Sequence, residues 1–228
     1  MFSRFTRVLR GLFLPALMLT PTVVMAADLP ELKPVLGERG ELLFSEDFDG
    51  PDAKPLVRSA ASQPQIIDGH VSLMQVEDAK HIGVVNLWER DREPVTDLIM
   101  QADFQWNGGH TFNVEFKKPG KVVHGDPPEF FVLFRGTGEG NRPMGVSLAD
   151  NAPRAAVGKQ MIAIEPGQWC RFMIEIRDGQ VAVQMHDGQV IRGACNKASD
   201  PKGAPSLSFA GVDGKGVNVD NIRVWSFK

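Results

Sequence analysis

The chain contains no tyrosine, and aromatic residues make up only 8% of its 228 positions. Aromatic rings are the usual stacking platforms for sugars, so this shortage counts modestly against tight glycan binding. Neither sign of charge is in large excess, because the chain has 25 basic and 28 acidic residues and a net charge of −3. Nucleic-acid binding requires a basic surface, and we therefore expect no nucleic-acid partner.

Several motifs of common catalytic sites are also missing. No two of the five histidines have the H-x-H or H-x-x-x-H spacing of a metal site. There is no Gly-x-Ser-x-Gly elbow, and the glycine-rich RGTGEGN at 135–141 is not followed by the Lys-Ser/Thr of a phosphate-binding loop. The sequence predicts no cofactor apart from a structural calcium, for which Asp213 and Asp220-Asn221 would be oxygen donors.

A cluster of possible metal ligands occurs between residues 124 and 129. His124, Asp126 and Glu129 lie within six residues of one another, in VVHGDPPE. The two prolines favour an ordinary loop over a metal site in this segment. Asp213 and Asp220 are likewise interpreted first as turn residues and only second as calcium ligands. No metal-binding residue is therefore assigned.

The only long apolar run lies at the start of the chain. MFSRFTRVLR carries Arg4, Arg7 and Arg10, and GLFLPALMLTPTVV and the small residues of MAA follow it. This order is typical of a secretory signal peptide, which predicts cleavage after Ala26 or Ala27 and a periplasmic or secreted protein without a membrane anchor. A retained anchor is the rival interpretation, although the run is shorter than a spanning helix needs.

The remaining sequence predicts one β-rich domain preceded by a short arm. Residues 27–40 have no clean period and are expected to form a linker or an N-terminal arm. From 41 to 228, apolar and polar residues alternate in short segments bounded by glycine, proline, aspartate and asparagine, which predicts an all-β sandwich or barrel. Two Asp-Gly pairs, at 178–179 and 187–188, predict two-residue hairpin turns and a three-stranded meander over about 170–195.

The chain has two cysteines, and the two arguments about their pairing disagree. Export favours a disulfide between Cys170 and Cys195. The predicted meander places them at opposite ends of its middle strand, roughly 20 Å apart at ~3.3 Å per residue. A disulfide needs Cα atoms within about 7 Å, so the geometry favours free thiols.

Three segments resemble the concanavalin A-like lectin and glucanase superfamily. They are LLFSEDFDG at 42–50, GQWCRFMIEIRDGQVAVQMHDGQ at 167–189 and VNVDNIRVW at 217–225. The chain is especially similar to secreted domains assigned to 3-keto-disaccharide hydrolases and their laminin-G-like relatives. The resemblance implies a jelly roll of two antiparallel sheets, one of them concave and often lined for sugar. The Glu-x-Asp-x-x-Glu strand of laminarinase-like members is absent, which argues against their retaining mechanism.

The segment QADFQWNGGHTFNVEFK, residues 101–117, suggests a carboxylate pair. If its two alternating runs form a hairpin, a three-residue loop at 108–110 keeps both apolar sets on one core face. That register places Asp103 directly opposite Glu115, roughly 5 Å apart between Cβ atoms. Such a separation suits the two acids of a retaining glycosidase, whereas neutralisation by Lys117 or Arg135 would make the pair purely structural.

The polar positions of the alternating segments are the candidate ligand-binding residues. If their strands share the concave sheet, they present amides, acids and cations to sugar hydroxyls, and Trp88 in NLWERDRE adds an aromatic ring from a loop. These candidates are Gln101, Gln105, Asn113, Lys117, Arg135, Glu175, Gln184, His186 and Trp88. A solvated sheet face would show the same alternation.

The sequence thus predicts an exported β-sandwich that binds oligo- or polysaccharide on a polar concave face. One alternative is a glycoside hydrolase of the keto-sugar hydrolase type that uses Asp103 and Glu115. Another is an interaction module of the cell envelope that uses the same face to bind protein. The fold supports all three.

Overall fold

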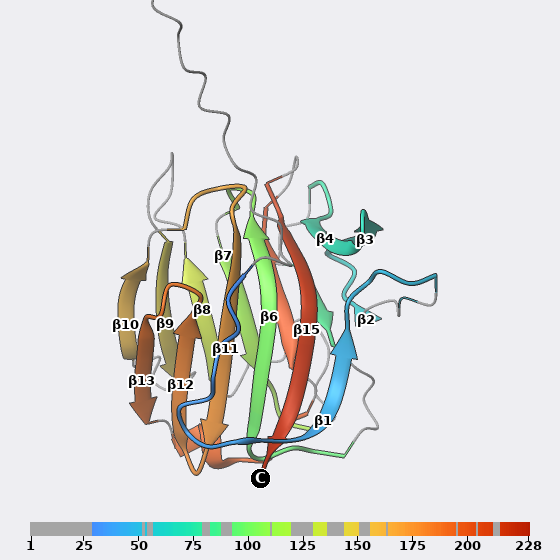
Figure 1. Cartoon of the computed structure of the whole chain (residues 1–228). Coiled ribbons are helices and arrows are strands. Elements are labelled where there is room, and N and C mark those ends of the chain that lie inside the picture. The colour runs from blue at the N-terminus through green and yellow to red at the C-terminus, as the bar shows by residue number, and fades with distance from the viewer. Residues whose placement is uncertain are drawn as a thin grey trace, which may run out of the picture.

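A computed structural model of the chain describes residues 29–51, 53, 57–78, 83–87, 93–109, 111–119, 130–135, 144–150, 156–162, 164–194, 196–203, 205–211 and 215–228. Two antiparallel sheets face one another across a single core (Figure 1). This confirms the predicted all-β sandwich. No helix in these ranges is both long and apolar enough to cross a membrane.

Sheet A has eight strands and contains both β1, near the N-terminus, and β15, at the C-terminus. Its order is β13 (Val190–Ala194), β12 (Gln180–Met185), β11 (Trp169–Arg177), β6 (Leu98–Trp106), β15 (Val217–Phe227), β4 (His70–Gln75) and β3 (Ser62–Ile67), and β1 (Arg39–Glu46) also pairs with β15. A 3₁₀ turn, η2 (Asn196–Ser199), follows β13.

Sheet B has seven strands and lies behind sheet A in Figure 1. Its order is β10 (Ala156–Ile162), β9 (Met144–Asp150), β8 (Phe130–Arg135), β7 (Thr111–Phe116), β14 (Ser206–Ala210), β5 (Gly83–Asn86) and β2 (Val57–Arg58).

The core between the sheets is built around a cluster of phenylalanines. Phe104 and Phe172 come from sheet A, and Phe112 and Phe134 come from sheet B. Their ring centroids lie 5.2 to 6.3 Å apart, and all four side chains are fully buried. Since side chains alternate along a strand, the residues between these phenylalanines point to the outer face of each sheet.

The predicted hairpin between Asp103 and Glu115 is wrong. β6 belongs to sheet A and β7 to sheet B, so the chain crosses the sandwich between them. The crossing is tight: Trp106 Nε1 donates a 2.8 Å hydrogen bond to the carbonyl of Gly109, and a Cβ on Gly109 would lie 2.5 Å from the Lys215 carbonyl oxygen. Two alternating strands can bury their apolar faces in one core either as neighbours in one sheet or from two facing sheets. The sequence pattern is the same in both arrangements and did not distinguish them.

The meander is confirmed for its first turn and wrong by one residue for its second. Asp178 and Gly179 have φ values of 49° and 76°, and Arg177 pairs with Gln180, as a two-residue hairpin requires. The second loop has three residues, 186–188, because the Met185 N–H donates to the Gln189 carbonyl at 2.9 Å. There only Gly188 adopts a positive φ.

Cys170 lies at the start of β11 as a buried, free thiol. Burial raises its pKa from 9.0 to about 12, and the negative charges of Asp187 and Asp103 add to this effect. Cys195, its predicted partner, lies outside the described residues.

Candidate functional site

The predicted ligand-binding residues do not share one face, because their strands belong to different sheets. Gln101, Gln105, Glu175 and Gln184 alternate with core residues of β6, β11 and β12 and lie on the outer face of sheet A. Asn113 and Lys117 lie on the outer face of sheet B. The expectation of a single concave face carrying all of them is therefore wrong.

The other three candidates occupy less informative positions. His186 lies in the turn after β12, where its N–H donates to the Arg171 carbonyl at 2.8 Å. Arg135 is the last residue of β8 and pairs with Thr111, but its side chain is outside the described part of the structure. Trp88 is outside it as well, as are His110, His124, Asp126, Glu129 and Asp213.

On sheet A, Asp103 is held by one cation, Arg171, and one amide, Asn221, and it does not face Glu115. The side chain is fully buried, and Arg171 clamps it with two hydrogen bonds, Nε to Oδ1 at 2.6 Å and Nη2 to Oδ2 at 2.8 Å. Asn221 Nδ2 adds a third, to Oδ2 at 3.1 Å. Such a bidentate pair holds a carboxylate in a fixed position.

Asp220 lies beside Asp103, on the neighbouring strand β15. Burial is the main reason why its pKa rises from 3.8 to about 6, and repulsion from Asp103 contributes. A bulge follows it, in which Asn221 has a φ of 50° and donates its N–H to Asp220 Oδ1 at 2.6 Å.

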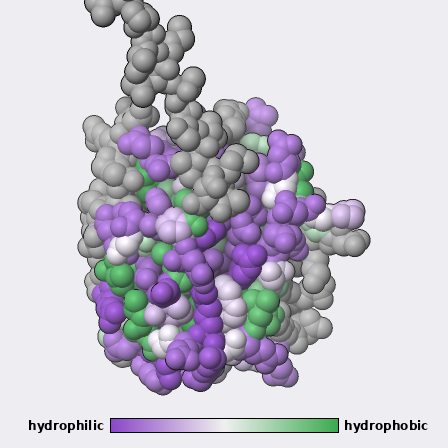
Figure 2. Space-filling view, viewed as in Figure 1, coloured by the Kyte–Doolittle hydropathy of each residue, from purple (hydrophilic) through white to green (hydrophobic). Residues whose placement is uncertain are grey.

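Residues 29–38 run across the outer face of sheet A, and we call them the arm. In Figure 1 the arm descends in front of β11 before it turns toward β1. The carbonyls of Leu29 and Lys33 accept hydrogen bonds of 2.8 Å from Arg171 Nη1 and Gln184 Nε2 respectively. The buried Glu175 carboxylate accepts the N–H groups of the arm's C-terminal half. Hydrophilic residues run down the middle of the same view in Figure 2.

On sheet B, hydroxyl and amide side chains from three neighbouring strands form a contiguous group. β14 lies between β5 and β7, and the register places Ser206 between Asn86 and Glu115, and Ser208 opposite Asn113. Residues directly opposite one another share a face. We call Asn86, Thr111, Asn113, Glu115, Ser206 and Ser208 the sheet B cluster.

The sheet B cluster is buried but incompletely hydrogen-bonded. Asn113 Nδ2 donates to Ser208 Oγ at 3.0 Å, yet Asn113 Oδ1 has no partner among the described residues. The hydroxyl oxygens of Thr111 and Ser206 are buried and unpartnered in the same part of the chain. Buried polar atoms normally find a partner, so these three unpaired oxygens make the cluster a candidate site for a hydrogen-bonding ligand.

One ion pair borders this cluster. Lys117 Nζ lies 3.4 Å from Glu115 Oε2, and the Lys117 side chain is only 2% exposed. This is the neutralising contact that the sequence offered as the alternative to a carboxylate pair. The cluster, with Lys117 at its border, therefore presents an acid, a cation, amides and hydroxyls on the outer face of sheet B, a set of groups that can hydrogen-bond a polyhydroxylated molecule.

The described residues contain no group of three histidine, cysteine or acidic side chains that could hold a metal ion. Near η2, a lysine occupies the kind of oxygen cage that a cation prefers. Lys202 is 2% exposed, and its ammonium donates to the carbonyls of Thr96, Ala198 and Asp200. The calcium suggested by the sequence stays a prediction, since Asp213 is outside the described part.

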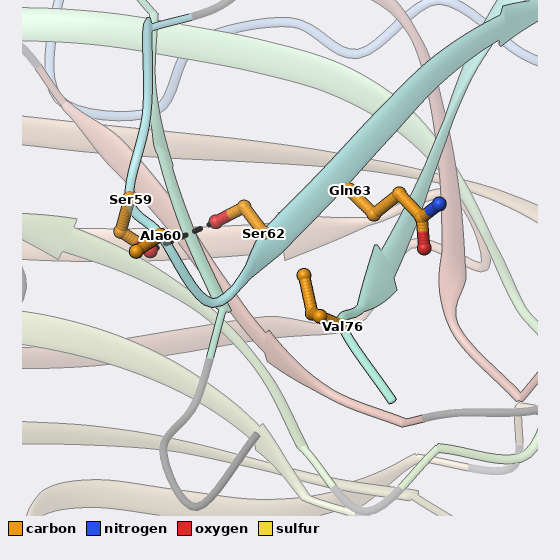
Figure 3. Close-up of a pocket in the computed structure, with 5 residues that line it drawn as sticks. All are labelled: Ser59, Ala60, Ser62, Gln63 and Val76. Carbon is orange, nitrogen blue, oxygen red and sulfur yellow. Dashed lines mark hydrogen bonds between the residues drawn. The ribbon is translucent and has the colours of Figure 1, made fainter. Parts of the chain in front are cut away.

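A small cavity of about 330 Å³ opens at the edge of the sandwich, beside β3 (Figure 3). Its lining consists of Ser59, Ala60, Ser62, Gln63 and Val76. The two serine hydroxyls already hydrogen-bond one another at 3.0 Å, and Ser62 also bonds the Val84 carbonyl at 2.6 Å. With its hydroxyls used internally, this cavity offers a ligand little beyond one amide.

Sequence reasoning missed Arg171, the serines of β14 and the use of the arm. The β14 serines were within reach, because the alternation in SLSF places Ser206 and Ser208 together on the face opposite Leu207 and Phe209. The arm gave no clear signal, since its hydrogen bonds to sheet A are made mainly by its main-chain atoms.

No protein-family model and no curated protein matches the chain. Solved structures match it in fold. A Bacillus subtilis protein of unknown function with a galectin-like fold has a TM-score of 0.61 at 12% identity, over 83% of this chain and 97% of that one. The exoplasmic/lumenal domain of VIP36, in a Ca²⁺/Man-bound form, has a TM-score of 0.58 at 10% identity, over 82% and 92%.

A laminarinase from Flavobacterium sp. UMI-01 is similar as well, with a TM-score of 0.55 at 10% identity over 82% of this chain and 100% of that one. At such identities the likeness establishes the fold alone. The chain has the concanavalin A-like jelly-roll fold that its three sequence segments suggested.

Proposed function

We propose that this protein is an exported carbohydrate-binding protein whose sugar site is the sheet B cluster. The observation that carries the proposal is the set of three buried, unpartnered oxygens on Thr111, Asn113 and Ser206. A sugar supplies the hydroxyl donors that such oxygens lack, and pairing them removes the penalty of leaving polar atoms unsatisfied. The fold shared with the Ca²⁺/Man-bound exoplasmic/lumenal domain of VIP36 supports this choice of ligand.

Access to the cluster is expected from the side of Thr111 and Glu115, which are partly exposed, whereas Ser206 and Ser208 are at most 1% exposed. A ligand would therefore meet Glu115 first, whereas its partner Lys117 is only 2% exposed. The Glu115 carboxylate and the buried hydroxyls and amides can all hydrogen-bond the hydroxyl groups of a neutral saccharide.

An oligosaccharide array followed by calorimetry tests the proposal. Asn113→Ala should weaken binding of the best glycan at least tenfold, because it removes one unpaired acceptor and the Nδ2 donor to Ser208. The matched control is Gln105→Ala, which truncates an amide on the outer face of sheet A and should leave affinity unchanged. Absence of binding to every glycan by the folded wild-type chain would refute the assignment.

A glycoside hydrolase of the keto-sugar hydrolase type is the second candidate, and the similar fold of a laminarinase favours it. Asp103 and Glu115 are too far apart to act as its catalytic pair, because they lie on the outer faces of opposite sheets. A hydrolase would have to combine Glu115 with another acid near the sheet B cluster. Absence of turnover by the folded wild-type chain would eliminate this function, unchanged turnover in Glu115→Gln would exclude Glu115 from it, and Gln105→Ala serves as the control on the other face.

Export to the periplasm or beyond is part of the same proposal, and it rests on the signal-peptide pattern of residues 1–26. The proposed mature chain begins with a short arm, at residue 27 or 28, followed by one sandwich domain. Mass spectrometry of the protein recovered from the cell envelope should give an N-terminus there, and an intact Met1 would contradict it.

A further inference from the structure

The arm is bound to sheet A mainly through its own main chain. Four side chains donate to arm carbonyls, at distances between 2.7 and 3.2 Å. These donors are Arg39, Arg171, Arg177 and Gln184, and the accepting carbonyls are those of Leu29, Pro30, Leu32, Lys33 and Leu36. Recognition of carbonyls is independent of side-chain identity, as in proteins that bind extended peptides.

Glu175 supplies the complementary acceptor. Its carboxylate receives the Val35 N–H at 2.9 Å on both oxygens and the Leu36 N–H at 2.7 Å. Gln184 Nε2 fixes the carboxylate from the other side at 2.9 Å. Hydrogen bonds from neutral N–H groups to a charged, buried acceptor are about twice as strong as those between neutral groups.

Apolar contacts set the register of the arm. Leu29 packs on Trp169, and Leu32 fills a cluster with Ile99 and Met173 that Trp225 and Phe227 extend. Two arginines border this cluster by stacking on its rings, Arg39 over Trp225 at 4.5 Å and Arg177 over Phe227 at 4.9 Å. The face therefore has pockets for apolar side chains in addition to its main-chain contacts.

The arm passes close to two side chains of sheet A at Gly37. A Cβ on Gly37 would lie 2.1 Å from Arg177 Nη1 and 2.9 Å from Phe227 Cδ1. A larger residue at this position would force the Arg177 and Phe227 side chains to move, so a glycine is favoured in any segment that binds in the same way. The pattern that fits is Leu-x-x-Leu, then two residues whose main-chain N–H groups can donate to Glu175, then a glycine, as in Leu29 to Gly37.

We propose that the outer face of sheet A is a peptide-binding site for extended segments of this pattern, and that the arm is its resident, exchangeable ligand. The partner that we propose is the same segment from a second copy of the chain, because it has the same sequence as the arm. Its contacts are the arm's own, and a tethered arm would compete with it at an effective concentration in the millimolar range. The site is separate from the sheet B cluster and does not depend on carbohydrate binding.

The test uses the full mature chain and a fluorescent peptide with the sequence LPELKPVLGE. Gly37→Val should displace the arm, which hydrogen exchange reports as at least tenfold faster exchange of the Val35 and Leu36 amides. The peptide should then bind this variant at least tenfold more tightly than wild type, whose own arm competes. Arm amides that remain protected in the variant would contradict the role given to the close contact at Gly37.

Two matched pairs make the result specific. Glu175→Gln in the Gly37→Val background should weaken peptide binding at least tenfold, whereas Arg192→Ala, an exposed change on β13, should not. A peptide N-methylated at Val35 and Leu36 should likewise lose binding. One N-methylated at Lys33, whose amide bonds to no described residue, should retain it. Equal binding of both methylated peptides, or no binding to the opened variant, would overturn the proposal.

Discussion

Asp103→Asn offers the sharpest test of how sheet A is held together. The substitution keeps the shape of the side chain and removes its charge, leaving the Arg171 guanidinium beside a neutral amide in a position where Asp103 is fully buried. Breaking a buried ion pair by removing one partner destabilises proteins by about 3–5 kcal/mol. Because Arg171 is itself 11% exposed and can recover some hydration, we expect the lower end, about 3 kcal/mol.

The measurement is urea denaturation, in which the midpoint should fall while the slope stays constant. In a thermal scan the same loss corresponds to a fall in Tm of roughly 6–12 °C for a domain of this size. Arg171 also donates to Leu29 in the arm, so exchange of the arm amides should accelerate in the same variant.

A double-mutant cycle with Arg171→Met isolates the pair. The two changes together should destabilise less than the sum of the single changes by about 2 kcal/mol, because the second removes the charge that the first left unpaired. Additive effects, or a loss below about 1 kcal/mol for Asp103→Asn, would refute the view that this carboxylate is structural. Asp103 would then again be a candidate for catalysis.

Four further outcomes follow from the described geometry. The pKa of Asp220 is raised to about 6, so the folded protein binds more protons than the unfolded one between pH 4 and 6; stability should fall as pH rises through this window, by about 1 kcal/mol after solvent screening, and Asp220→Asn should abolish the fall in denaturation curves. Lys202→Met should lower the free energy of unfolding by about 3 kcal/mol, since three carbonyls lose their donor. Cys170, with its pKa raised to about 12, should resist a thiol reagent at pH 8 until denaturant is added, and rapid labelling of the native protein would contradict its burial. Phe104→Ala should cost about 3–5 kcal/mol, measured in the same way, because it leaves a cavity among the core rings.

The strands were predictable because their signals are local. Alternation and turn residues lie within a few positions of one another, which is why the hairpin at Asp178-Gly179 was predicted with its correct register. The partner of each strand was not predictable in the same way. β6 and β7 alternate as a hairpin would, and only the tight crossing at Gly109 places them in opposite sheets.

The candidate site was predicted in its chemistry but not in its grouping. Amides and acids on alternating positions were correctly expected to leave the core, yet assigning Gln101 and Asn113 to one face required knowledge of sheet membership. The arm was beyond reach for a different reason. Glu175 recognises its N–H groups, which every residue except proline has, so the sequence of the arm does not reveal where it binds.

The arm also links the first and the later parts of the described chain during folding. Val35 and Glu175 are separated by 140 residues, so the first described segment to leave the ribosome is held by strands that are made much later. Contacts this distant in sequence form slowly, because a long loop must close before they contribute. We expect the arm to dock only after β11 and β12 have formed, because those strands supply Glu175 and Gln184, and the outer face of sheet A is open to water until then.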